Sequence, residues 1–96
     1  MKVPAHTRLE DLQAVAAKLS IEVEFSNLSN SEIPVKSGYC KLKNKDMIIL
    51  DKGLSQEEQI EILLQALKKF DLESIYIPAW MREWLERQTP NTLKTI

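Results

Sequence analysis

Histidine, cysteine and glycine are scarce in this chain of 96 residues, which has one histidine, one cysteine and two glycines. A catalytic zinc needs about three protein ligands around one open position. Ser–His–acid and Cys–His nucleophiles both need a histidine base, and His6 is far along the chain from Cys40. Gly38 and Gly53 stand alone, so no phosphate-binding loop is present. We therefore expect no enzyme activity, no metal and no cofactor.

Long apolar runs and an excess of either charge are also missing. Thirteen Lys and Arg oppose fourteen Asp and Glu, so the net charge of −1 gives no overall field that attracts nucleic acid or an anionic membrane. Charged residues interrupt every apolar stretch well before the roughly 18 residues of a membrane span. The start MKVPAHTRLEDLQ lacks the apolar core of a secretion signal, and a lone cysteine forms no intrachain disulfide. These features predict a soluble, cytoplasmic protein with one domain over residues 1–96 and no membrane partner.

Three segments have the apolar spacing of helices. The T-x-x-E spacing of Thr7 and Glu10 predicts a capping box at the first helix start. Ser55 and Glu58 repeat it before a helix that runs to Phe70. Pro78 suits the first turn of a last helix, which Pro90 stops, and residues 89–96 are expected to form a flexible tail.

Three other segments have the pattern of strands. Apolar and acidic residues alternate over 21–25, and a polar loop over 26–37 follows. GYCKLK and MIIL, joined by turn residues 44–46, indicate a β-hairpin, and the unbroken apolar run of 47–50 predicts a central strand covered on both faces. The sequence thus predicts an α+β fold with a small, mostly antiparallel three-stranded sheet packed with two or three helices. The predicted order is helix, strand, strand, strand, helix, helix.

The helix over 55–70 has an apolar face about 200° wide, against the usual arc of a little over 100°. The sheet can cover one side of it, and the first helix, the last helix or another subunit must cover the other. The last helix carries a second apolar stripe whose aromatic members are typical of interfaces. We therefore predict a non-catalytic domain that self-associates as a homodimer or binds a protein partner. The candidate interface residues are Ile77, Trp80, Met81 and Trp84. The alternative is that these residues only complete the core.

A second hypothesis is weak nucleic-acid binding through the lysine-rich hairpin over 36–45. An exposed aromatic ring among lysines can stack on a base while the ammonium groups meet phosphates. The candidate contacts are Lys36, Tyr39, Lys41, Lys43 and Lys45. Lysines on an edge strand also prevent aggregation, which is the structural alternative. A third hypothesis is an unrecognised hydrolase or a ligand-binding pocket that uses Cys40, Tyr39 and a carboxylate.

The segment LLQALKKF resembles the L-A-H-E-L-G-H-L helix of small zincin-like bacterial peptidases, and the order of elements resembles their minimal core. Gln65, Ala66 and Lys69 stand at the positions of the first His, the Glu and the second His. The resemblance therefore implies a related fold without zinc ligands or general base. The span from SGYCKLK to IYIPAWMREWLE is also similar to short uncharacterised bacterial proteins that share the pattern G-x-C-x-[LV]…IIL…ALxxFDLExIYIPxxxRExLE. That similarity implies no known activity.

Overall fold

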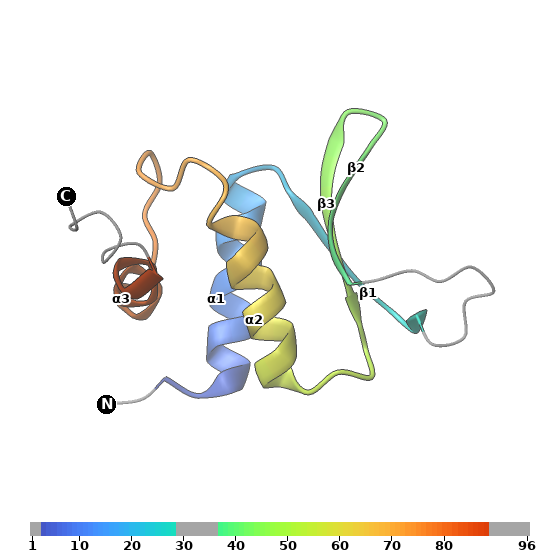
Figure 1. The fold of residues 1–96 in the computed structure, drawn as a ribbon. Coiled ribbons are helices and arrows are strands. Elements are labelled where there is room, and N and C mark those ends of the chain that lie inside the picture. The colour runs from blue at the N-terminus through green and yellow to red at the C-terminus, as the bar shows by residue number, and fades with distance from the viewer. Residues whose placement is uncertain (1–2, 29–36, 89–96) are drawn as a thin grey trace.

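Two helices lie between a three-stranded sheet and a third helix (Figure 1). The computed structural model describes residues 3–28 and 37–88. The elements are α1 (Ala5–Lys18), β1 (Glu22–Ser26), β2 (Gly38–Leu42), β3 (Lys45–Asp51), α2 (Gln56–Leu67) and α3 (Ala79–Gln88). The α+β class and the order of elements are confirmed. The expected tail over 89–96 and Lys36 lie outside the described residues.

The sheet has the order β1-β3-β2, so β3 is the central strand, as predicted. The sheet is mixed rather than mostly antiparallel as predicted, because β2 pairs with β3 antiparallel whereas β1 pairs with β3 parallel. The hairpin turn reverses the chain, which makes β3 run in the same direction as β1. Lys43 and Asn44 form this turn with φ of 52° and 66°, the left-handed values that match the twist of a two-residue hairpin. The turn therefore begins one residue earlier than the sequence predicted.

The helices cover only one face of the sheet among the described residues (Figure 1). Ile48 and Leu50 face them and are fully buried. Met47 lies on the opposite face by the alternation of a strand. The prediction that this strand is covered by other elements on both faces is wrong for the described chain. Met47 is nevertheless buried, and its cross-strand neighbours in register are Glu22 and Cys40.

The two predicted capping boxes had different outcomes. Ser55 accepts a hydrogen bond from the Glu58 amide at 3.2 Å, and the Glu58 carboxylate accepts one from the Ser55 amide at 3.0 Å, so the box at α2 is confirmed. The box at Thr7 is wrong. Helix α1 begins at Ala5 after Pro4, whose carbonyl already accepts the Thr7 amide at 3.1 Å.

The wide apolar face of α2 is covered within one chain. The sheet lies on one side of the α1–α2 pair, α1 packs beside α2, and α3 lies on the side away from the sheet (Figure 1). Leu63 and Leu67 are fully buried, while Ile62 and Phe70 are partly exposed. No other subunit is needed to cover α2, so a dimer requires a different argument.

Candidate functional site

The four candidate interface residues of the last helix have two different environments. Ile77 and Met81 are 2% and 0% exposed and belong to the core. Almost none of their surface is exposed, which favours the alternative that these two residues complete the core. Trp80 and Trp84 are only partly buried. Of the four candidate residues, only Trp80 and Trp84 therefore contribute appreciable surface.

Both tryptophans line a groove of about 470 Å³ between α3 and the first turns of α1 and α2. Val3 and Leu64 supply its other apolar walls. We call this the indole groove. It forms because Met81 of α3 and Ile77 just before the helix are buried in the core, and the side of the helix with both indoles then lies beside α1 and α2.

The two indoles differ in their hydrogen bonding. Trp80 donates from Nε1 to the Asp11 carboxylate of α1 at 2.8 Å, which fixes that ring against the helix pair. Among the described residues, none accepts a hydrogen bond from the Trp84 indole. A partner that enters the groove therefore contacts the Trp80 ring, which is held by Asp11, and the Trp84 ring, whose indole N–H can donate a hydrogen bond to the partner.

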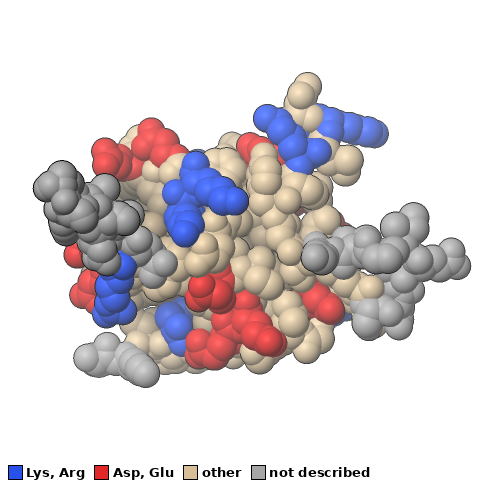
Figure 2. Space-filling view, in the orientation of Figure 1, with Lys and Arg blue, Asp and Glu red and all other residues tan. Residues whose placement is uncertain are grey.

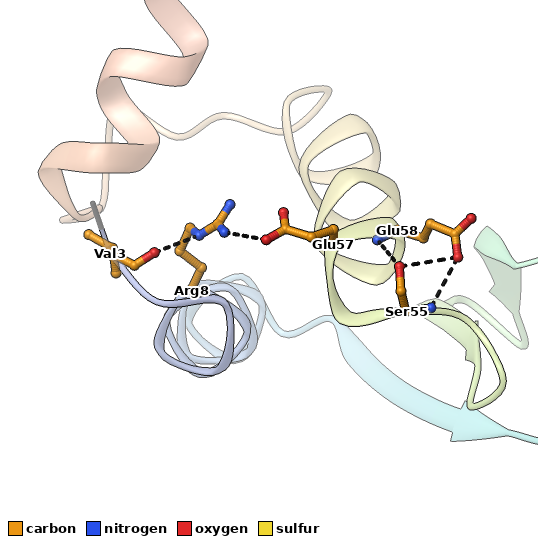
Figure 3. Close-up of polar contacts among 5 residues, drawn as sticks. All are labelled: Val3, Arg8, Ser55, Glu57 and Glu58. Atoms are coloured by element: carbon orange, nitrogen blue, oxygen red, sulfur yellow. Dashed lines mark hydrogen bonds and ion pairs between the residues drawn. The ribbon is translucent and has the colours of Figure 1, made fainter. Parts of the chain in front are cut away.

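Arg8 forms the floor at the α1 end of the groove, where it ties three segments together (Figure 3). Its Nε donates to the Val3 carbonyl at 3.0 Å, and its Nη2 donates to the Glu57 carboxylate at 2.7 Å. Sequence reasoning missed this role, because a contact between residues 49 positions apart leaves no local spacing signal.

The rim along α3 carries one charge of each sign. Glu83 and Arg87 are exposed, lie one helical turn apart and line the groove beside Trp84. A rim with this order of charges is complementary to itself when two copies of the helix run antiparallel.

The lysine-rich hairpin is not the free stacking platform that the sequence suggested. The Tyr39 ring packs edge-on against Phe70, with 5.8 Å between ring centroids. Its hydroxyl donates to Asp46, and this hydrogen bond raises the pKa of Tyr39 above its ordinary value. Lys45 pairs with Glu22 at 3.3 Å.

The other hairpin lysines remain in water. Lys41 and Lys43 are exposed, and Lys43 occupies the turn, so it does not share a strand face with Tyr39. Cys40 is a partly buried free thiol in β2.

The three positions of the zincin resemblance lie along or just after α2. Gln65 donates to Glu61 at 3.0 Å, Ala66 is buried and Lys69 is exposed. Over residues 3–28 and 37–88, no three His, Cys, Asp or Glu side chains are grouped to hold a metal ion.

Comparison of the chain with protein-family models, curated proteins and solved structures gave no match. In the described part of the chain, no helix is both long and apolar enough to cross a bilayer.

Proposed function

We propose that this protein is a non-catalytic interaction domain that self-associates through the indole groove. The observation that carries the proposal is the pair of partly exposed tryptophans, Trp80 and Trp84, in one groove of about 470 Å³. Tryptophan is the residue most enriched among the side chains that dominate binding energy, and such residues act in pockets from which a partner excludes water.

The rim charges favour a second copy of this chain as the occupant. In a two-fold dimer with antiparallel α3 helices, Glu83 of each copy faces Arg87 of the other, so both pairs form at once. Trp84 of each copy then enters the groove of the other, where its indole N–H meets new acceptors. Self-complementary charge fixes the register, while the indoles supply the apolar contact.

Trp84→Glu is expected to raise the dimer dissociation constant about 30-fold, because a tryptophan at an interface centre contributes roughly 2 kcal/mol or more. Sedimentation velocity over a concentration series measures this change. Gln13→Glu is the matched control, since it adds the same charge on an exposed part of α1 that lines no groove. Far-UV circular dichroism at the lowest concentration verifies that both variants are folded.

A parent chain that stays monomeric at every concentration contradicts self-association. A Trp84→Glu variant that is folded and dimerises as the parent does contradicts the role of the indole groove. Lys43→Glu is expected to leave the dimer intact, which separates this proposal from one in which the hairpin forms the interface.

A further inference from the structure

The large hydrophobic side chains that stay exposed lie at two opposite ends of the described molecule. Leu42 is 57% exposed and Tyr39 43% exposed on the β2–β3 hairpin, and Tyr76 is 71% exposed in the connection between α2 and α3. Figure 1 places the hairpin and this connection on opposite sides of the α1–α2 pair. Leu42 and Tyr39 lie on opposite faces of β2 by the alternation of a strand, so the exposed apolar group at the hairpin tip is Leu42.

The hairpin end is basic. Leu42 lies between Lys41 and Lys43 at the tip, and neither lysine makes an ion pair with any described residue. Figure 2 shows Lys and Arg gathered over this projecting tip. We call these three residues the basic tip.

The opposite end is a pair of adjoining hollows with an acidic rim. The hollows, about 270 and 240 Å³, share Ile77 and are bordered by Tyr76 and Leu72. The carboxylates around them belong to Glu73, Glu83 and Glu86, and a single cation, Arg82, lies among them. Figure 2 shows Asp and Glu gathered over the α2–α3 connection. We call this surface the acidic hollow.

Tyr76 shows how a cation is received there. The Lys18 ammonium lies 5.3 Å from the centre of its ring, the distance of a cation–π contact. None of the three rim carboxylates forms an ion pair with a described residue. The acidic hollow thus combines an exposed aromatic ring with three carboxylates that outnumber the one cation, Arg82, among the lining residues.

We propose that the basic tip of one copy docks into the acidic hollow of a second copy. Leu42 packs beside the exposed Tyr76 ring, and Lys41 and Lys43 meet the carboxylates of Glu73 and Glu86. The contact joins two different surfaces, so it is head-to-tail. In a pair of copies, the copy that contributes its basic tip keeps a free acidic hollow, and the other copy keeps a free basic tip. Few residues take part, which makes the contact weak and sensitive to salt.

This contact is separate from the indole groove. The groove lies on the side of α3 that carries Trp80 and Trp84, whereas the hollows lie on the side that carries Arg82 and Glu86. Glu83 borders both surfaces and is therefore left unchanged in the test.

The proposal is tested by zero-length cross-linking, which joins amines to carboxylates. The sample is a mixture of unlabelled chains and chains labelled with heavy nitrogen. We expect mixed-isotope cross-links that join Lys41 or Lys43 to Glu73 or Glu86 at low salt. Leu42→Ser should lower their yield about fivefold or more, the effect of losing about 1 kcal/mol of apolar contact. Trp84→Glu should leave the yield unchanged, because Trp84 lines the indole groove and not the acidic hollow. The experiment therefore distinguishes failure of this contact from failure of the α3 dimer.

Lys52 supplies the background, because it is an exposed lysine away from the basic tip. The proposal is contradicted if the tip lysines cross-link to Glu73 and Glu86 no more than Lys52 does, or if Leu42→Ser has no effect. Lys43→Glu is the second variant, with the same expected loss at a position where the turn tolerates a polar side chain.

Discussion

Trp80 shows how a single hydrogen bond shapes the candidate site. Its indole donor and the Asp11 carboxylate connect residues 69 positions apart and hold one wall of the groove against α1. The ring thereby serves both the fold and the groove. Trp84, one turn further along, has no such partner among the described residues, and this leaves it available for binding.

Trp80→Phe should lower the free energy of unfolding by about 1–2 kcal/mol, because the ring contact largely remains while a hydrogen bond to a charged group is lost. Urea unfolding followed by circular dichroism measures the change. Glu10→Gln is the control, as it alters an exposed carboxylate next to Asp11 in the chain. Equal stability of the Trp80→Phe variant and the parent would show that the bond to Asp11 has no structural role.

At the scale of the elements, predictions from local sequence succeeded where the interaction itself was local. The capping box joins Ser55 to Glu58, three positions further along the chain, and it is present as predicted. The same spacing at Thr7 failed, because the Pro4 carbonyl takes the first amides and Arg8 reaches back to Val3. A helix start thus depends on contacts that a spacing rule does not contain.

Thr7 and Ser55 provide a matched test of the difference between the two helix starts. Ser55→Ala should lower the free energy of unfolding by about 1 kcal/mol, since the Glu58 amide loses the hydroxyl oxygen that accepts its hydrogen bond. Thr7→Ala should change it by much less, because Thr7 lies within α1 and caps nothing. Thermal and urea unfolding of both variants give the comparison, and a larger loss for Thr7→Ala would contradict the observed start of α1.

The strands show the same limit. Alternation of side chains identified β1 and the hairpin, and the apolar run identified β3 as central. The parallel pairing of β1 with β3 was not predictable, because it depends on which strand is inserted beside which after a connection of eleven residues over 27–37. Likewise, the sequence could not show that Met81 is buried while Trp80 and Trp84 are only partly buried, because this depends on where α3 packs against the rest of the chain.

At the scale of the whole molecule, the wide apolar face of α2 is explained by three neighbours in one chain. The sheet, α1 and α3 together cover it, so most of the apolar surface that motivated a dimer at the level of sequence is buried within one chain. We propose that self-association uses the indole groove and its self-complementary rim instead. The Arg8–Glu57 ion pair supports the floor of that groove.

Exchange of the rim charges tests the central claim most directly. Glu83→Arg alone and Arg87→Glu alone should each weaken the dimer about tenfold, since each places like charges together at both symmetric pairs. The double variant restores opposite charges and should return the dissociation constant to within about threefold of the parent, a coupling that independent sites do not show. Sedimentation velocity of the four proteins at one salt concentration measures these constants. A double variant as weak as either single variant would contradict an antiparallel α3 interface.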